Sequence, residues 1–520
     1  MLNFLSQHES LSPNFAATSC LKTAMPWISS LVAVLCVLVF GKVIDTVYLL
    51  CYHPLAKYPG PRFAAISNVP FCYWFLSGRQ PFKILSLHEE YGPVVRIAPN
   101  ELSFNSPQSW KDIYASRPKH APFVKSKFYE GGSFAGRGVY SIVSERNVDK
   151  HARMRYYLSH AFSEKSLAEQ EDLISETCDR FVSLLASRGS KAHGYDISKG
   201  YEMATFDIIG LLAFGESFRG VESDQPHIWV SVTLGALTQG ALVEVFKRFV
   251  TVGKILAFLL QSRIKKLTRD TATNEQMAID LVNRRIQRTD ARHDFMTRIL
   301  EKRDPEEVSD LQLAAHASDF VLAGSETTAS ALSTITYYLL RTPHVMQILT
   351  EEIRGAFKHY GDITDRTTQR LPYLRAVILE GLRIYPPLPF PLPRVVPEGG
   401  DTVDGHMIPA GTIVSTNPLA ASLDPHNFKD PRVFKPERWL GENNNDLTDA
   451  SQPFSLGPRG CLGRSLGWLE LRTILCKIIW MYDLEMVSKS LEWHRDSKMH
   501  TLWRKPELLV KVRNRGVQMQ

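Results

Sequence analysis

Cys461 lies in a loop whose residue types suit a cysteine sulfur bound to a metal. The loop spans 454–463, and its glycines allow the backbone to curl so that amide groups turn towards the sulfur. Arg459 offers a fixed positive charge to a carboxylate of a bound group, and Phe454 can cover the site. The helical period that starts near Leu466 places the sulfur beside a helix N-terminus, which favours negative charge. The glycines are Gly457, Gly460 and Gly463.

The surroundings of Cys461 narrow the choice of metal. No second cysteine or histidine stands at the spacing of a zinc finger or an iron-sulfur cluster, and both sites need more ligands close by. One thiolate suits haem iron, because the porphyrin supplies four nitrogens and the protein a fifth, electron-donating ligand. A buried structural cysteine is the alternative for a lone cysteine. The loop resembles, at every fixed position, the haem-binding signature Phe-x-x-Gly-x-Arg-x-Cys-x-Gly of the cytochrome P-450 family, which favours haem.

A long helix is predicted from Ser309, whose hydroxyl forms a capping box with Gln312, to Arg341. Its middle, at 323–328, reads AGSETT. The two small residues would let a flat ligand approach the backbone, and a carboxyl followed by a hydroxyl could relay protons. A polar turn that faces solvent is the alternative interpretation of this hexamer.

The same hexamer resembles the oxygen-activation motif Ala/Gly-Gly-x-Asp/Glu-Thr of the family. Glu326 and Thr327 stand at the acid and alcohol positions. The resemblance implies that Thr327 stabilises the oxygen activated at the iron. It also implies that Glu326 helps to deliver protons to that oxygen.

A second helix is predicted from Pro372, with Glu380 and Arg383 on one face, and it ends at a pair of prolines. A surface ion pair is the default interpretation and contributes little. An apolar helix that ends at prolines is expected to be buried, however, where such a pair must be fully hydrogen-bonded. Arg438 can reach the same carboxylate. The three residues resemble the Glu-x-x-Arg and Pro-Glu-Arg-Phe elements of the family, with Trp439 in place of Phe, which implies a structural triad that locks the haem-binding core.

Three further residues match positions that contact the haem carboxylates in the family. His151 and Arg155 stand at the ends of a Trp-x-x-x-Arg pattern, with histidine in place of tryptophan, and Arg394 matches a second arginine. Ordinary helix surface is the alternative for the first two. The resemblance thus implies haem b with Cys461 as axial ligand. Its implied cofactor-binding residues are Phe454, Gly457, Arg459, Gly463, Arg394, Arg155 and His151.

Composition sets the broad class. The chain has 520 residues, 44% of them hydrophobic, which fits two or three average domains or one large fold. A formal net charge of +7 is mild, and no nucleic-acid-binding module is present in the sequence. The cysteines are odd in number and widely spread, so they indicate a reducing compartment and no disulfide framework. They stand at positions 20, 36, 51, 72, 178, 461 and 476.

The N-terminal part predicts a membrane anchor at 26–50, which is near the roughly 20 apolar residues that a membrane span needs. A cleaved signal peptide is the competing hypothesis, but no Ala-x-Ala-like site follows the apolar run. Basic residues after the span favour a cytosolic body and a lumenal tail at 1–25. A proline-rich hinge at 51–65 then leads to a catalytic domain at 66–520.

The predicted fold is a mainly α single domain with a small β-rich lobe, in which Val94–Ala98 and Glu101–Phe104 are short strands. The resemblance implies the cytochrome P-450 fold, with haem between the long helix and the cysteine loop. It implies a monooxygenase at the endoplasmic reticulum membrane whose electrons come from NADPH through the flavins of a separate NADPH-cytochrome reductase, with cytochrome b5 as a further candidate partner. Basic residues near the cysteine loop suggest a docking face. They are Arg432, Lys435, Arg459, Arg464 and Arg472.

Apolar residues in the regions that line the family's substrate pocket predict a lipophilic substrate, with a terpenoid, polyketide or alkaloid of fungal secondary metabolism as the favoured class. They include Phe123, Phe128, Phe134, Phe320, Leu388 and Leu392. Two alternatives stay open. One is a haem-thiolate isomerase or dehydratase, which would need no proton relay, and the other is a non-catalytic haem sensor or carrier, which would need no reductase.

Overall fold

The computed structural model contains two compact units, Met1–Tyr58 and Pro59–Gln520. Each unit is described by itself. The structure describes residues 14–131, 134–249, 253, 258, 261–288, 294–441 and 445–519.

The first unit is dominated by helix α1, Asn14–Val47, which continues as a π-helical turn over Tyr48–Tyr52. Within it, Ser30–Tyr52 is long and apolar enough to cross a membrane, and it is the one such helix in the described part of the chain. The anchor predicted at 26–50 falls in this helix. The predicted tail at 1–25 is helical from Asn14 onwards, and its first 13 residues lie outside the described ranges.

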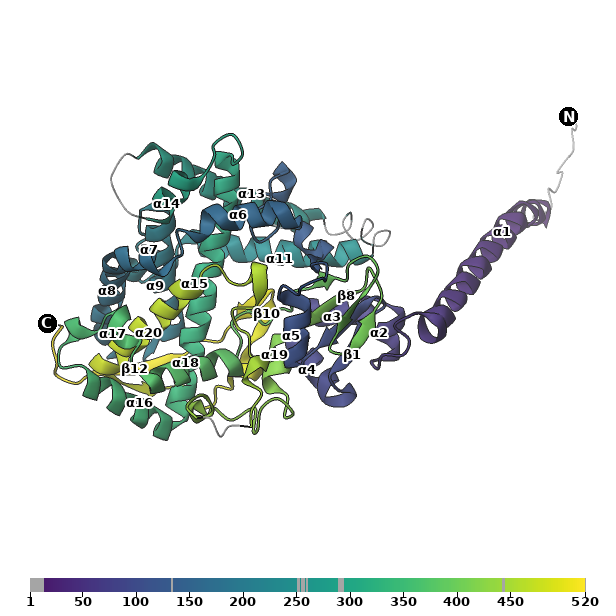
Figure 1. Ribbon diagram of the computed structural model, residues 1–520. Helices are drawn as coiled ribbons and strands as arrows, with labels where there is room; N and C mark the ends of the chain where they lie inside the picture. The colour runs from purple at the N-terminus through teal and green to yellow at the C-terminus, as the bar shows by residue number, and fades with distance from the viewer. Residues whose placement is uncertain are drawn as a thin grey trace, which may run out of the picture. The chain divides into compact units, whose positions relative to one another are not determined.

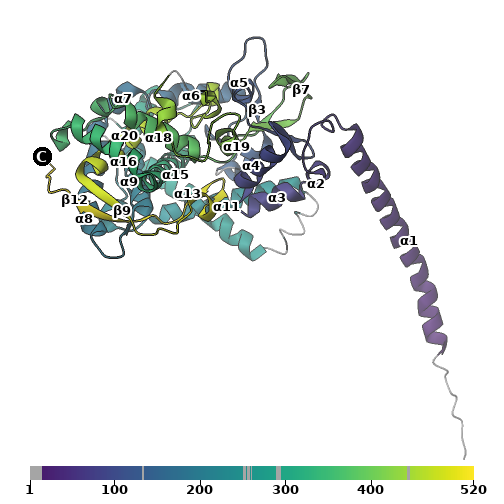
Figure 2. The ribbon, with the colours of Figure 1, turned by 90° about the horizontal axis from the view of Figure 1, so that it is seen from below.

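The second unit is mainly helical, as predicted, and α15 (Asp310–Arg341) runs through its middle, as Figures 1 and 2 both show. The other helices of this unit are α2 Arg62–Ile66, α3 Val69–Leu76, α4 Gln80–Tyr91, α5 Pro107–Tyr114, α6 Val148–Ser159, α7 Glu164–Glu169, α8 Glu171–Gly189, α9 Ile197–Phe214, α10 Gly220–Ser223, α11 Ile228–Arg248, α13 Gln261–Gln287, α14 Phe295–Lys302, α16 Pro343–Ala356, α17 Asp365–Thr368, α18 Pro372–Ile384, α19 Pro418–Leu423, α20 Arg464–Met481 and α21 Trp493–Asp496.

The strands form small sheets at two sides of the helical body (Figure 1). The largest sheet has the order β1-β2-β8-β5-β3, with β2 and β8 parallel and the other neighbours antiparallel. A second sheet has the order β4-β12-β9, and β6-β7 and β10-β11 form two-stranded ribbons. The strands are β1 Val94–Ala98, β2 Glu101–Phe104, β3 Val124–Lys125, β4 Tyr195–Asp196, β5 Arg394–Val395, β6 Asp401–Val403, β7 His406–Ile408, β8 Ile413–Thr416, β9 Tyr482–Met486, β10 Lys498–His500, β11 Leu502–Arg504 and β12 Leu509–Asn514.

Helix α15 begins where the sequence predicts, because the Ser309 hydroxyl accepts a hydrogen bond from the Gln312 N–H at 3.2 Å. The predicted capping box is half formed. The Gln312 side chain donates to the Tyr140 carbonyl at 3.3 Å instead of turning back to the cap. The cap therefore holds the helix start, while the glutamine ties it to a neighbouring loop.

Two glycines let helices approach α15 closely. A Cβ at Gly324 would lie 3.1 Å from the Ile209 side chain of α9, and a Cβ at Gly381 of α18 would lie 2.2 Å from the Ile335 side chain. The small residue at 324 was predicted to admit a flat ligand. In the structure its lack of a side chain allows α9 to pack on α15, so this part of the prediction was wrong.

Candidate active site

The cysteine loop lies between a 3-10 turn, Gly457–Arg459, and helix α20. The Cys461 N–H donates to the Phe454 carbonyl at 2.8 Å, which closes the loop. Gly457 has a φ of +70°, and a Cβ there would meet the Tyr114 carbonyl oxygen at 2.1 Å, so both conformation and space require glycine.

The other two loop glycines have ordinary negative φ values. Gly460 has a φ of −62° and Gly463 a φ of −85°, so neither uses the left-handed region. Ser455 does, with a φ of +57°. Phe454 packs against Trp468 of α20, with ring centroids 6.3 Å apart. The left-handed turns therefore lie before the cysteine, and the chain enters α20 directly after it.

The Cys461 side chain is solvent-accessible, although protein surrounds it closely. That surrounding raises the pKa of the thiol, while a hydrogen bond from the Gly463 N–H and the charges of Arg155 and Arg464 lower it. The start of α20 thus aids the thiolate as predicted, but burial has the larger effect. A metal cation at the sulfur would overcome this effect, because a coordinating thiol is deprotonated outright.

Four cations gather around His151 of α6, which is buried. Burial lowers the pKa of His151 to about 3, and the nearby charges lower it further, so the imidazole is neutral. These cations are Arg459, Lys125, Arg155 and Arg394. The three arginines were predicted from the sequence, but Lys125 was not. It lies on the two-residue strand β3, where no sequence motif indicates a role for a lysine.

The arginines of this cluster bond to oxygens that carry no charge. Arg155 donates to the Gly460 carbonyl at 2.7 Å, and Arg459 to the Glu145 and Arg146 carbonyls at 2.7 and 3.0 Å. Arg394 donates to the Tyr129 hydroxyl at 3.3 Å. Within the described residues, none of the three forms an ion pair. A group that carries carboxylates fits such a cluster, because its charge would balance theirs.

The middle of α15 carries the predicted oxygen motif. The Thr327 hydroxyl donates to the Ala323 carbonyl at 2.6 Å, and this hydroxyl and Ala323 are both accessible. The preceding residue, Glu326, is buried, and its Oε2 lies 3.3 Å from Nζ of Lys505. The two residues are adjacent in sequence but lie in different surroundings, and Lys505 was not predicted.

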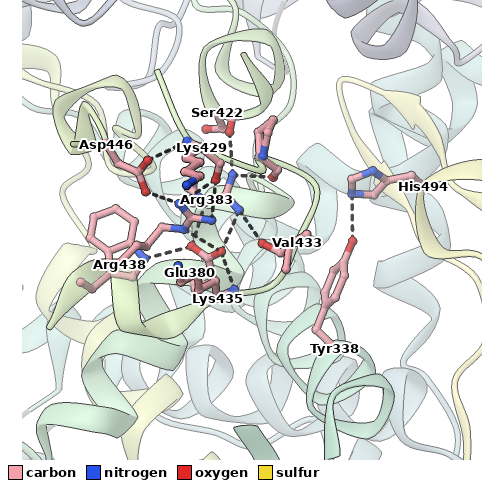
Figure 3. Close-up of polar contacts among 12 residues, drawn as sticks. Tyr338, Glu380, Arg383, Ser422, Lys429, Val433, Lys435, Arg438, Asp446 and His494 are labelled. Carbon is pink, nitrogen blue, oxygen red and sulfur yellow. Dashed lines mark hydrogen bonds and ion pairs between the residues drawn. The ribbon is translucent and has the colours of Figure 1, made fainter. Parts of the chain in front are cut away.

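The predicted triad is brought together around Glu380, as Figure 3 shows. Arg383 binds this carboxylate through two hydrogen bonds of 2.8 and 2.7 Å, and Arg438 adds one of 3.1 Å. The Lys435 N–H and the Trp439 indole N–H add bonds of 2.9 and 3.0 Å. The tryptophan that replaces the expected phenylalanine therefore supplies an additional donor.

The predicted docking and pocket residues are placed as follows. Arg432 is paired with Glu89 at 2.8 Å and Arg472 with Asp365, so two candidates of the docking face already have carboxylate partners. Phe128, a predicted pocket residue, stacks on Phe390 with ring centroids 4.5 Å apart. Phe390 lies between the predicted pocket residues Leu388 and Leu392 in the sequence. Phe134 is fully buried and belongs to the core.

An accessible thiol held by a glycine loop, beside a cluster of cations that fits carboxylates, defines the class of haem-thiolate proteins. The comparisons agree. A family model described as cytochrome P450 matches residues 60–512. The chain is 53% identical over 440 residues to cytochrome P450 monooxygenase ORF11 of Penicillium roqueforti (strain FM164). The aligned residues cover 85% of this chain and 91% of that protein.

Other relatives are also fungal. Cytochrome P450 monooxygenase BipB of Cochliobolus sativus is 42% identical over 476 residues, covering 90% of this chain and 94% of its own. Cytochrome P450 monooxygenase BOT4 of Botryotinia fuckeliana is 40% identical over 466 residues, covering 89% and 87%. The chain therefore belongs to the cytochrome P450 family, as a monooxygenase whose cofactor is haem held by a cysteine thiolate.

Proposed function

We propose that this protein inserts one oxygen atom from O₂ into a lipophilic intermediate of fungal secondary metabolism, a terpenoid, polyketide or alkaloid, by hydroxylation or epoxidation. The electrons come from NADPH through a separate flavin-containing reductase, with cytochrome b5 as a second donor. The fungal monooxygenases among the relatives support the reaction class. The apolar helix Ser30–Tyr52 supports a single-pass anchor in the endoplasmic reticulum, with the catalytic domain in the cytosol.

In this proposal the thiolate of Cys461 would hold the haem iron. The observation that carries it is the accessible Cys461 thiol beside arginines that have no carboxylate partner within the described residues. The haem supplies the activation of O₂ when bound. Arg155, Arg394 and Arg459 hold its carboxylates, and the neutral His151 lies among them without adding charge.

Glu326 and Thr327 of α15 handle protons in this proposal. The Thr327 hydroxyl already donates to the Ala323 carbonyl, so its oxygen is left to accept a second hydrogen bond. Glu326, one residue earlier, is the proton donor behind it. Glu380, Arg383 and Arg438 fix the loop segments around α18 and take no part in the chemistry.

The proposal is tested by the absorption spectrum of the reduced, carbon monoxide-bound protein. Wild type should show the red-shifted Soret band of thiolate-bound haem, and Cys461→Ala should lack it. Cys476→Ala is the matched control, because Cys476 is a buried core residue of α20. A red-shifted band that survives in Cys461→Ala would contradict the assignment of the ligand.

Electron supply is tested separately with a reductase and NADPH. The proposal predicts product that depends on both. Turnover without NADPH would favour an isomerase or dehydratase, and a thiolate-type spectrum with no turnover on any lipophilic substrate would favour a sensor or carrier.

A further inference from the structure

A buried group of three charges adjoins the oxygen motif. Nζ of Lys505, which follows β11, lies 3.3 Å from Oε2 of Glu326 on α15 and also forms an ion pair with Glu202 on α9. The side chains of Lys505 and Glu326 are 4% and 8% exposed, whereas that of Glu202 is 25% exposed. The group therefore leads from the interior, at Glu326, towards solvent at Glu202.

The main chains around this group are fixed to each other. The Thr205 hydroxyl, one turn after Glu202, lies 3.0 Å from the Ser325 carbonyl oxygen and 2.9 Å from the Tyr201 carbonyl oxygen of its own helix. Gly324 lets Ile209 of α9 pack against the same turn of α15. The two helices are therefore in close contact beside the group, and Glu202 and Glu326 share one ammonium group.

The charges of the group do not balance when every member is ionised. One ammonium and two carboxylates leave a net charge of −1 in a largely buried site, which is costly. A single proton on one carboxyl brings the sum to zero. Burial and the charge of Glu202 both raise the pKa of Glu326, and Lys505 lowers it. The charged neighbours that act on Lys505 within the described residues are these same two carboxylates.

The contacts decide which carboxyl holds the proton. The contact of Lys505 with Glu202 is the shorter one, and its contact with Glu326 is long for a charge-assisted hydrogen bond. Glu326 is also the more deeply buried of the two, so its charged form is the less favoured. Burial and contacts thus favour a proton on Glu326, with Glu202 as the counterion of Lys505.

We propose that Glu202 is a positioning residue that acts as the counterion of Lys505 and so keeps Glu326 protonated at neutral pH, and that Lys505 is a positioning residue that stabilises the carboxylate left when Glu326 gives up its proton towards Thr327. This proposal rests on the proposed function of Glu326 as the proton donor. When the proton leaves, the O–H bond of Glu326 breaks and the electron pair stays on the carboxylate, which Lys505 faces. A proton from water at the exposed side of Glu202 then restores the neutral group.

Infrared spectroscopy of the full-length protein at pH 7, with and without ¹³C-glutamate labelling, tests the proposal. Wild type should show a protonated-carboxyl band that is lost in Glu326→Gln. The band should also be lost in Glu202→Gln, because Lys505 then has Glu326 as its one counterion and holds it ionised. In Lys505→Met the band should persist or grow, because two neighbouring buried carboxyls then lack a cation.

Glu470→Gln is the matched control. Glu470 of α20 is buried beside Thr328, and burial raises its pKa to about 8, so it contributes a separate band that Glu202→Gln should leave unchanged. A wild-type spectrum without a Glu326-dependent band would overturn the proposal, and so would a band that is unaffected by Glu202→Gln.

The carbon monoxide spectrum of each variant separates the two proposals. If the thiolate-type band is missing in wild type, the proposed function fails whatever the carboxyl region shows. If the thiolate-type band is present in every variant and Glu202→Gln leaves the carboxyl band unchanged, the proposed function stands. The proposed role of Glu202 and Lys505 is then wrong.

Discussion

Glu380 and Glu326 are both buried carboxylates that face cations, yet their surroundings differ. Glu380 is fully buried and accepts five hydrogen bonds, two from Arg383 and one each from Arg438, Lys435 and Trp439. Within the described residues, Glu326 receives one hydrogen-bond contact, 3.3 Å long, from Lys505. The first carboxylate has its acceptor positions filled, whereas the second keeps room for a proton.

This difference separates a structural carboxylate from a chemical one. A proton on Glu380 would displace a donor and leave the buried guanidinium of Arg383 without its counterion, whereas Arg438 would keep Asp446. A proton on Glu326 removes an excess negative charge, since Glu202 still balances Lys505. The number of donors around a buried carboxylate, more than burial itself, thus indicates whether it can exchange protons.

The largest expected effect is that of Glu380→Gln. A neutral amide cannot accept from two guanidinium groups as the carboxylate does, so the free energy of unfolding should fall by about 3–5 kcal/mol. Urea unfolding, together with the yield of haem-containing protein, measures it. Glu351→Gln on α16 is the control, because it removes a carboxylate that accepts from the Gln347 side chain at an exposed position. Equal free energies of unfolding for Glu380→Gln and Glu351→Gln would contradict the structural role of Glu380.

Glu326→Gln should lower turnover while leaving stability almost unchanged. The amide resembles a protonated carboxyl in shape, so the free energy of unfolding should change by no more than about 1 kcal/mol. Turnover should fall by about 10²-fold, the lower end of what a positioned proton donor contributes. Rates with reductase and NADPH, set beside urea unfolding, check both halves. A large loss of stability with normal turnover would make Glu326 structural.

Thr327→Ala should lower the fraction of NADPH electrons that is used to form product. Haem content should stay unchanged, and the product formed per NADPH should fall by roughly tenfold, about 1.4 kcal/mol in differential barrier, as electrons pass to peroxide. Product, NADPH and peroxide are counted in the same assay. Thr334→Ala on the same helix is the control, since the Thr334 hydroxyl is buried with no hydrogen-bond partner within the described residues. Normal coupling in Thr327→Ala would leave Thr327 as a helix residue only.

The smallest expected effect is that of Trp439→Phe. It removes the 3.0 Å indole hydrogen bond to Glu380 and leaves the other four, so the free energy of unfolding should fall by about 1 kcal/mol. The carbon monoxide spectrum should not change. Stability equal to wild type would mean that Glu380 was already saturated by the remaining donors.

Much of the fold follows from local sequence patterns. The Ser309 cap and the prolines that bound α18 each act within a few residues, and these helices begin or end where the signals stand. The predicted strand Val94–Ala98 is also present. The triad was predictable in part, because Glu380 and Arg383 share one helix face.

Contacts between distant segments were not predictable in this way. Lys505 lies 179 residues from Glu326, and Lys125 joins the arginine cluster from a two-residue strand. Gly324 was assigned to ligand access, whereas its neighbour is Ile209 of another helix. Such pairings depend on how helices pack, which a single chain's periodicity does not specify.

The contact of Gly381 with Ile335 has a consequence for sequence variation. A Cβ at 381 would lie 2.2 Å from the Ile335 side chain. Helices α18 and α15 therefore contact each other through the hydrogen of Gly381 and the side chain of Ile335. Because α18 carries Glu380 and α15 carries Glu326, this contact sets the spacing between the helices that carry the two carboxylates. We expect a relative with alanine at position 381 to have a smaller side chain than isoleucine at 335, since only a paired exchange keeps the two helices at the same distance.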